Sequence, residues 1–223
     1  MLSCEQLLMG ESMSEERVAA REHWASQGRA PFYEASQHWR RFIAERISMY
    51  TPKSVFEFGC NAGRNLVEVR KAAPEARLSG VDINEDAVRF GEETYGLRLH
   101  VAGEEYLAAM EDCGTDVAFT VSVLDHLPVV EPAFEDLARI SRKALLLLEP
   151  YTGSVGRTDR RGPVVEASAE NLTSVPFTYA WDYLELTRKL EGRWHWRWTP
   201  YPLSTENMGP HYWLIEGVRQ GNP

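Results

Sequence analysis

The segment from Lys53 to Gly63 contains the residues whose types and spacing suit chemistry best. An apolar run ends at Glu57, and Gly59 and Gly63 follow before a stretch of helical character. This order predicts a strand, a tight loop and a helix, with glycine where the backbone passes close to a ligand. A second acid, Asp82, closes the next apolar segment at a spacing that suits the hydroxyl groups of a ribose. The pattern therefore predicts a site for an adenosine-bearing cofactor at the carboxyl ends of a parallel sheet.

The loop differs from two other nucleotide-binding loops. A dinucleotide-binding loop, G-x-G-x-x-G, would need glycine at 59, 61 and 64, whereas the chain has Gly59, Asn61 and Arg64. A P-loop is excluded because no Gly-Lys-Ser/Thr follows. The pattern that remains is E-x-G-C-x-x-G, for which a tight strand-to-helix turn in another kind of α/β protein is the alternative.

The composition indicates an ordinary globular enzyme. A chain of 223 residues fits one domain with a substantial core. The formal charge of −9 argues against nucleic acid as a partner, and no apolar run approaches the ~20 residues that cross a bilayer. The first residues are too acidic for a signal peptide, and Cys4, Cys60 and Cys113 have no paired spacing. We therefore expect a cytoplasmic protein without a metal site or membrane partner.

The elements that position these residues alternate between strand and helix. The sequence predicts an N-terminal helical extension over residues 1–52 that could act as a lid, followed by one cofactor-binding domain over 53–223. Alternation predicts an α/β fold with a doubly wound, mostly parallel sheet and right-handed crossovers. The expected parallel strands are 53–58, 76–83, 97–101, 115–124 and 143–150. Residues 151–192 would form a substrate loop and helix, and 193–203 and 211–219 a C-terminal antiparallel strand pair.

Four segments resemble the motifs of class I methyltransferases that use S-adenosylmethionine, of the small-molecule type. VFEFGCNAGRN resembles the first motif, LSGVDINEDAV the second, VAGEEY the third and DVAFTVSVLDHLP the fourth. The resemblance covers roughly residues 53–150 by motif and the last two strands by architecture. It implies a Rossmann-like fold and S-adenosyl-L-methionine as the cofactor.

The resemblance also implies the cofactor contacts. The strand-end acid, Glu57, would help to hold the ammonium group of the methionine part, Asp82 would bind the ribose hydroxyls and Ile83 would pack on the adenine. The chain departs from the family at Asn61, where a glycine is usual, but asparagine tolerates left-handed backbone conformations. The third motif has glutamates where an aspartate is usual. The predicted set is Glu57, Gly59, Cys60, Asn61, Gly63, Asp82, Ile83, Glu104, Glu105 and Val121.

The implied reaction is methyl transfer to a small molecule, at oxygen rather than nitrogen. A hydroxyl acceptor benefits from a general base, and Asp125 and His126 follow the fourth motif's strand, where the carboxyl edge of the sheet opens to substrate. The alternatives are a histidine hydrogen-bonded to the backbone before Pro128 and an aspartate that caps the turn.

Aromatic and basic residues beyond the parallel strands are candidates for binding an acidic or sugar-like acceptor. The predicted substrate-binding residues are Tyr33, Tyr151, Arg157, Trp181 and His211. Trp24 and Trp39, with Tyr33, could cover the pocket. For the tryptophans of RWHWRW, packing on a helix is the favoured interpretation.

Two other classes of protein remain open. One is another adenosyl-cofactor enzyme, such as an aminopropyl transferase, although that enzyme would want acids in the fourth motif besides Asp125. The other is a non-catalytic binding protein on the same fold. The oligomeric state is not fixed by the sequence, and the aromatic C-terminal region could form the interface of a homodimer.

Overall fold

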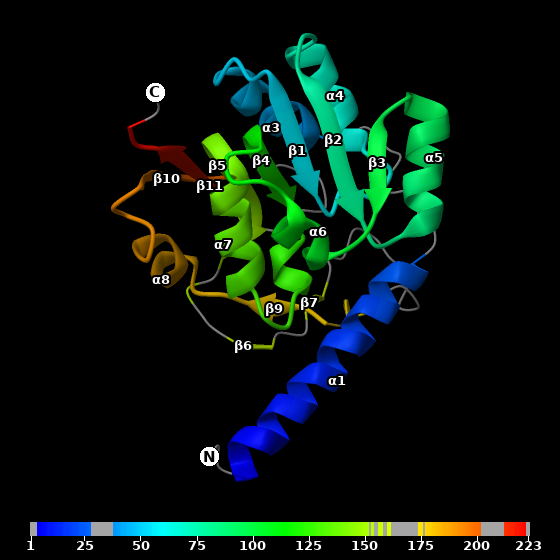
Figure 1. The fold of residues 1–223 in the computed structure, drawn as a ribbon, viewed down its shortest axis with the longest axis vertical. Helices are drawn as coiled ribbons and strands as arrows, with labels where there is room; N and C mark the ends of the chain where they lie inside the picture. The colour runs from blue at the N-terminus through cyan, green and yellow to red at the C-terminus, as the bar shows by residue number, and fades with distance from the viewer. Residues whose placement is uncertain are drawn as a thin grey trace.

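A seven-stranded sheet organises the chain in the computed structural model, with the strand order β10-β11-β5-β4-β1-β2-β3 (Figure 1). The structure describes residues 4–27, 38–151, 153, 156–157, 160–161, 174–175, 177–201 and 212–221. The strands of the sheet are β1 (Ser54–Phe58), β2 (Arg77–Asp82), β3 (Arg98–Val101), β4 (Thr115–Val121), β5 (Ser141–Pro150), β10 (Trp194–Pro200) and β11 (Tyr212–Arg219). The helices are α1 (Cys4–Ser26), α3 (His38–Ser48), α4 (Arg64–Ala72), α5 (Glu85–Tyr95), α6 (Glu104–Ala109), η1 (Leu124–His126), α7 (Glu131–Ile140) and α8 (Tyr183–Arg188).

The direction of the strands confirms the predicted doubly wound sheet. Strands β1 to β5 pair in parallel, whereas β11 is antiparallel to both of its neighbours, β5 and β10. Strand β10 therefore runs in the same direction as β5. All the parallel strands end at one edge, and the carboxyl ends of β1 and β2 point toward the upper end of α1 (Figure 1).

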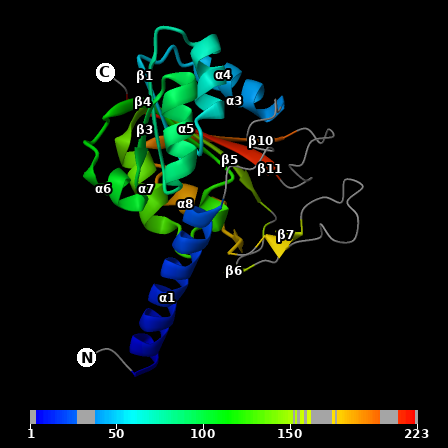
Figure 2. The same ribbon diagram turned by 90° about the vertical axis from the view of Figure 1, so that its right-hand side faces the viewer.

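The central parallel strands β1, β4 and β5 contribute side chains to two cores, one on each face of the sheet. In β1, Val55 packs on the face covered by α3, α4 and α5, and Phe56 packs on the face covered by α7 and α8. The leucines of β5 alternate in the same way. Figure 2 shows α4 and α5 on the side of the sheet opposite α7. Burial on both faces explains why β4 and β5 are mostly apolar.

The two N-terminal helices differ in their role. Helix α3 packs on α4 and places Ile43 and Ile47, both 0% exposed, in the core. Trp39 lies in the same core and is therefore a packing residue, not part of a lid. Helix α1 instead begins at Cys4, and its N-terminal end extends away from the sheet (Figure 1). In the described part of the chain no helix is long and apolar enough to cross a membrane.

The C-terminal strands confirm the interpretation of the RWHWRW segment. Trp196 stacks on Phe134 of α7, with ring centroids 5.9 Å apart, and on Trp194 at 5.7 Å. Arg197 points to the other face, where its guanidinium lies 3.6 Å from Glu216. Between β5 and α8, short two-residue strands pair β6 (Gly156–Arg157) with β9 (Tyr179–Ala180) and β7 (Arg160–Arg161) with β8 (Ser174–Val175).

Candidate functional site

The loop between β1 and α4 is a tight left-handed turn. The backbone N–H groups of Gly59 and Cys60 both donate to the carbonyl of Val81, at 2.9 and 3.0 Å. Gly59, Asn61 and Gly63 have φ angles of 71°, 47° and 73°. Asn61 therefore adopts the left-handed conformation expected of it, and its own Oδ1 accepts the N–H of Ala62 at 2.9 Å.

Glycine is needed at both ends of this loop because neighbouring side chains occupy the space that a Cβ atom would take. A Cβ atom at Gly59 would lie 2.3 Å from Cγ2 of Val123, in the turn after β4. A Cβ atom at Gly63 would lie 2.5 Å from Cδ1 of Leu97. These contacts fix the loop between the turn after β4 and the residue that precedes β3.

Asp82, at the end of β2, joins the loop to the start of α5. Its Oδ2 accepts the N–H of Asn61 at 2.7 Å, and its Oδ1 accepts the N–H of Asn84 at 2.8 Å. Burial raises the pKa of Asp82, and the backbone N–H groups of residues 84, 61 and 83 oppose that rise. Asn84 caps α5 by accepting the N–H of Ala87 at 2.9 Å. The carboxylate of Asp82 is thus oriented by the backbone, with Ile83 half-buried beside it.

Glu57 is fully buried beneath the loop. Its Oε1 accepts Nδ2 of Asn65 at 2.6 Å. Its Oε2 and Oδ1 of Asn65 are buried and accept no hydrogen bond from any described residue. Burial raises the pKa of Glu57 well above its usual range, while the bond from Asn65 and the charge of Arg40 act in the opposite direction. Two adjacent acceptors therefore lack donors at the end of β1.

The acids of the third motif are bound by α1. Arg21 donates to both carboxylate oxygens of Glu105, at 2.8 and 2.9 Å, and Arg17 lies 3.4 Å from Glu104. The N–H of Gly103 also donates to Glu105, at 3.0 Å. The hydrogen bond from Arg21 is the main reason why the pKa of Glu105 falls to about 2. Both side chains are largely exposed, so the pair stabilises the docked helix only weakly.

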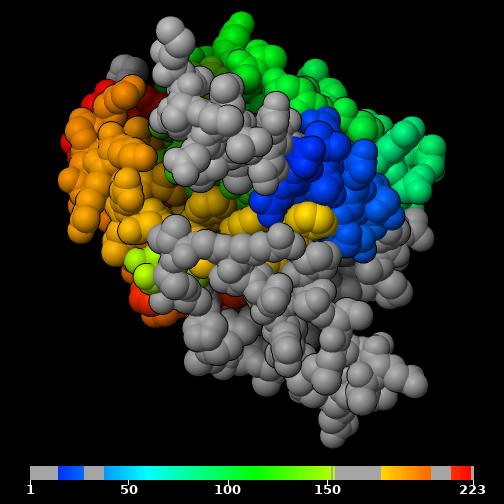
Figure 3. Space-filling view, turned by 90° about the horizontal axis from the view of Figure 1, so that it is seen from below, coloured from blue at the N-terminus to red at the C-terminus, as the bar shows by residue number. Residues whose placement is uncertain are grey.

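Helix α1 continues from these acids to the turn after β4. Its Trp24 lies over His126, with ring centroids 4.0 Å apart. Its Glu16 accepts the hydroxyl of Tyr179 at 2.7 Å, and Figure 3 shows the helix beside the segment that contains Tyr179. The C-terminal half of α1 therefore lies against the carboxyl edge of the sheet, and the role of the N-terminal segment as a lid stays a prediction.

The turn after β4 holds Asp125 and His126 together. The side chain of Asp125 is 0% exposed and that of His126 is 15% exposed, and Oδ1 lies 3.8 Å from Nε2. Nδ1 of His126 lies 3.3 Å from the carbonyl of Phe177. Trp181 donates from Nε1 to the carbonyl of Leu124 at 3.0 Å. The rings of Trp24 and Trp181 and the backbone carbonyl of Phe177 thus contact the turn, while the ring of Phe177 lies beside His23.

Sequence reasoning missed Glu149, the last acid of β5, which lies directly beneath this turn. It is 0% exposed, and its two carboxylate oxygens lie 3.1 and 3.2 Å from the N–H of Val123. The sequence contained a sign of its importance, because a single acid follows four leucines in a strand expected to be buried.

The sequence of residues 56–145 matches a family model described as a methyltransferase domain. The chain contains a methyltransferase domain. The matched segment includes the loop after β1, Asp82, the third-motif acids and the turn after β4. The resemblance of the four motifs to methyltransferases is therefore confirmed, and the small-molecule type stays a prediction.

Solved structures share the fold of this methyltransferase domain at low sequence identity. The plantazolicin methyltransferase BpumL, solved with a triazolic desmethylPZN analog and SAH, is 15% identical, with a TM-score of 0.64 over 94% of this chain and 98% of that chain. A SAM-dependent methyltransferase from Archaeoglobus fulgidus is 15% identical, with a TM-score of 0.58 over 83% and 96% of the two chains. A protein that converts a disulfide bond into a thioacetal group during echinomycin biosynthesis is 17% identical, with a TM-score of 0.59 over 87% and 89%. No curated protein matches the chain in sequence.

The methyltransferase domain brings some of the predicted acceptor-binding residues to the site. Trp181 contacts the turn that holds Asp125 and His126, as described above. Tyr151 instead packs beside Trp198, with ring centroids 5.2 Å apart, and Val121 is half-buried at the end of β4. The backbone of Arg157 pairs with Tyr179, but its side chain lies outside the described part of the structure. Tyr33 and His211 also lie outside the described residues.

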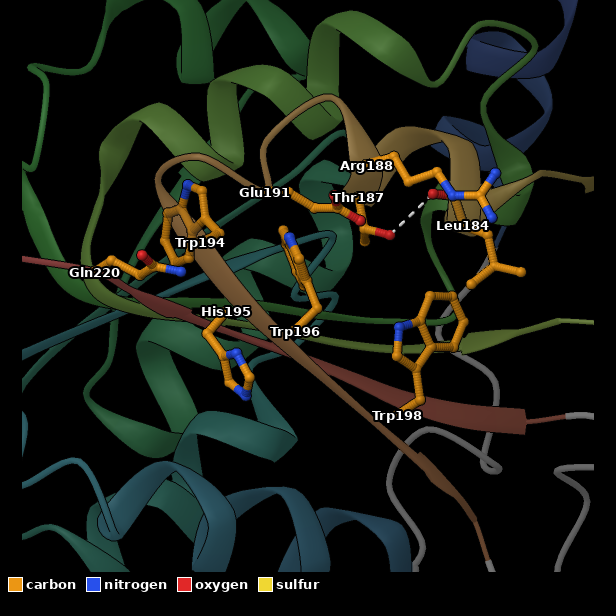
Figure 4. A pocket seen from close by; sticks show the side chains of 9 residues that line it. All are labelled: Leu184, Thr187, Arg188, Glu191, Trp194, His195, Trp196, Trp198 and Gln220. Atoms are coloured by element: carbon orange, nitrogen blue, oxygen red, sulfur yellow. Dashed lines mark hydrogen bonds between the residues drawn. The ribbon is translucent and has the colours of Figure 1, made fainter.

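A separate pocket of about 430 Å³ lies between α8 and β10, and Figure 4 shows the residues that line it. They are Leu184, Thr187, Arg188, Glu191, Trp194, His195, Trp196, Trp198 and Gln220. None of them is a predicted site residue. The pocket includes the first residue of β10, which runs parallel to β5, so it extends toward the amino edge of the sheet. Because ligands of doubly wound sheets bind at the carboxyl edge, we place the functional site at the loops described above and not in this pocket.

Proposed function

We propose that the protein transfers a methyl group from S-adenosylmethionine to a small-molecule acceptor, at oxygen rather than nitrogen. The observation that carries this proposal is the pair of hydrogen bonds that hold Asp82 between the loop after β1 and the start of α5. Each carboxylate oxygen accepts one of these backbone N–H groups and keeps a lone pair for another donor. A ribose offers two adjacent hydroxyl groups, which suits a carboxylate oriented in this way.

The buried acceptors beneath the loop fit the amino-acid end of the same cofactor. Oε2 of Glu57 and Oδ1 of Asn65 receive no hydrogen bond from the described residues, and an ammonium group has three N–H donors to offer. Its positive charge would also favour the ionised form of Glu57, which burial alone disfavours. The residues present therefore fit the group. The BpumL structures, which share this fold, contain SAH.

S-adenosylmethionine, when bound, would supply a methyl group on a positively charged sulfur: the acceptor would bond to the methyl carbon as the carbon–sulfur bond breaks, and S-adenosylhomocysteine would leave. The protein then has to orient the acceptor and exclude water. The C-terminal half of helix α1 lies at the edge of the sheet where this would occur and would help to exclude water. His126 is the candidate for the proton of an acceptor hydroxyl: if Nδ1–H donates to Phe177, the lone pair is on Nε2. Asp125, 3.8 Å away, would stabilise the resulting cation.

The aromatic side chains around the turn favour an acceptor with a ring. Trp24, Phe177 and Trp181 could stack on a planar or sugar-like group. Arg157, Tyr33 and His211 stay predictions for the contacts that recognise an acidic substituent. The unpaired Cys60 and Cys113 support a location in the cytoplasm.

The test is a methyl-transfer assay with labelled S-adenosylmethionine and a panel of phenols, sugars, hydroxy acids and amines. We expect labelled product with a hydroxyl acceptor, and a fall in kcat of about 100-fold or more for His126→Ala. His195→Ala, an exposed histidine on β10, is the matched control and should transfer at the normal rate. Binding of the cofactor without transfer to any member of the panel would favour the non-catalytic binding protein.

A further inference from the structure

Glu149 is an acid in a position that burial makes unfavourable. The four leucines that precede it in β5, residues 145–148, are 0% exposed, and so is Glu149. An acidic group in such surroundings costs several kcal/mol unless hydrogen bonds compensate. Strand pairing does not explain an acid at position 149, because the residue opposite Glu149 on β11 is Trp213, which carries no charge to pair with it. Its contacts therefore indicate a purpose other than packing.

Those contacts all lead to the turn that follows β4. The N–H of Val123 donates to both oxygens of Glu149, at 3.1 and 3.2 Å, and the hydroxyl of Thr120 donates to Oε1. Ser122, between them in sequence, has a left-handed φ of 53°. Its N–H donates to the carbonyl of Leu148 at 3.0 Å, so β5 holds this turn at two successive residues.

The held turn connects two parts of the functional site. The side chain of Val123 fills the space next to Gly59, where a Cβ atom would lie 2.3 Å from Cγ2. Asp125 and His126 follow within three residues. A shift at Val123 would therefore move the contact with the cofactor loop and the candidate base together.

We infer that Glu149 is a positioning residue: through the N–H of Val123 it fixes the turn at Ser122–His126 against the cofactor loop, and a change in its own ionisation alters that turn through the same hydrogen bonds. The inference rests on the proposed methyl transfer for its catalytic consequence. Glu149 itself is fully buried and would act through Val123 and Asp125, not by touching the acceptor.

The charges around Glu149 support a change near neutral pH. Burial, followed by the charge of Asp125, raises the pKa of Glu149 to about 8, while the bonds from Thr120 and Val123 lower it. From β11, the hydroxyl of Tyr212 lies 2.7 Å from Oγ of Ser122, and Oγ lies 3.4 Å from Oδ1 of Asp125. Below this pH Glu149 is neutral. Above it Glu149 is a carboxylate, which is a stronger acceptor for the N–H of Val123.

The experiment uses the full chain and follows the amide resonance of Val123 by NMR from pH 6 to 9.5, roughly the range that brackets the titration. Three variants are compared with the unmodified protein: Glu149→Gln, Glu149→Leu and Glu216→Gln. Glutamine keeps an acceptor for Val123 but cannot ionise, and leucine removes the acceptor. Glu216 is the matched control, because it is also a buried acid next to β5. It accepts a hydrogen bond from Tyr50 and pairs with Arg46, and neither residue belongs to the turn after β4.

We expect the Val123 amide to titrate with a midpoint near pH 8 in the unmodified protein and in Glu216→Gln, and to be flat in Glu149→Gln. The amide should exchange with solvent at least about tenfold faster in Glu149→Leu, because it loses its acceptor. In the transfer assay, an inflection of kcat at the same pH should disappear in Glu149→Gln. A titration that persists in Glu149→Gln, or unchanged exchange in Glu149→Leu, would overturn the inference. These amide measurements need no turnover, so a failure of the proposed methyl transfer would show itself separately, in the assay alone.

Discussion

The indole of Trp24 lies against the imidazole of His126, with ring centroids 4.0 Å apart and planes inclined by 39°. One residue is on the N-terminal helix and the other follows the fourth strand of the sheet. The contact makes α1 part of the functional site, because the same helix holds the third-motif acids through Arg17 and Arg21. A helix that touches both places can close the carboxyl edge over a ligand.

Removing the indole should therefore weaken catalysis without unfolding the protein. We expect Trp24→Ala to lower kcat/KM by about 2- to 10-fold, which corresponds to the ~0.5–1.5 kcal/mol of an aromatic pair. Val18→Ala, on an exposed position of the same helix, is the matched control. Equal kcat/KM values for the two variants would show that α1 has no part in the reaction.

The bridge between Arg21 and Glu105 should depend on pH in the acidic range. The pKa of Glu105 falls to about 2 in the folded protein, below its ordinary value of 4.5, so its contribution to stability is present above 4.5 and is lost as the pH falls through about 2. The difference in unfolding free energy between the unmodified protein and Arg21→Ala should therefore shrink as the pH falls from about 5 to about 3. Because both side chains are exposed, this difference starts at no more than about 1 kcal/mol.

Denaturant unfolding at a series of pH values measures this difference. Added salt should reduce it at pH 7 as well, since surface charges are screened. A difference that stays constant from about pH 5 to about pH 3 would mean that the bridge does not stabilise the docked helix.

Because Val123 packs directly against Gly59, alanine at position 59 should cost more unfolding free energy than alanine at a glycine with open space around it. Gly59→Ala introduces both a left-handed alanine and a clash, so we expect a loss of about 3 kcal/mol in unfolding free energy. Gly96→Ala has a similar φ of 60° but open space around it, and should lose only about 1 kcal/mol. Adding Val123→Ala to Gly59→Ala should remove the clash but leave the backbone strain.

Chemical denaturation of the single and double variants measures these values. Equal losses for Gly59→Ala and Gly96→Ala would contradict the close contact, as would a double variant in which the two losses simply add.

The sequence predicted the sheet and the cofactor loop because both depend on local patterns. Apolar runs and glycine spacing report strand, turn and helix directly. The predicted strand at 115–124 was wrong at its end, because β4 stops at Val121. The cause is distant in sequence: Glu149 binds the N–H of Val123 and bends the chain into the turn.

A contact between distant segments was also missed around the third motif, where α1 binds the acids. Glu105 is 84 residues from Arg21, and no periodicity connects them. Trp39 was a possible lid residue by type, but the helical face that it shares with Ile43 is buried. Contacts between segments far apart in the chain decide such roles, and a single sequence does not contain them.

The central claim is that the loop after β1 and Asp82 bind an adenosyl cofactor. Calorimetric titration with S-adenosylmethionine, S-adenosylhomocysteine and NAD tests it most directly, on the unmodified protein and on Asp82→Ala. Asp86→Ala is the matched control, an exposed acid that pairs with Arg89 on α5. The account predicts micromolar binding of the first two ligands and none of NAD, with at least about tenfold weaker binding in Asp82→Ala alone. Failure of the unmodified protein to bind either adenosyl ligand, or equal binding by Asp82→Ala, would contradict it.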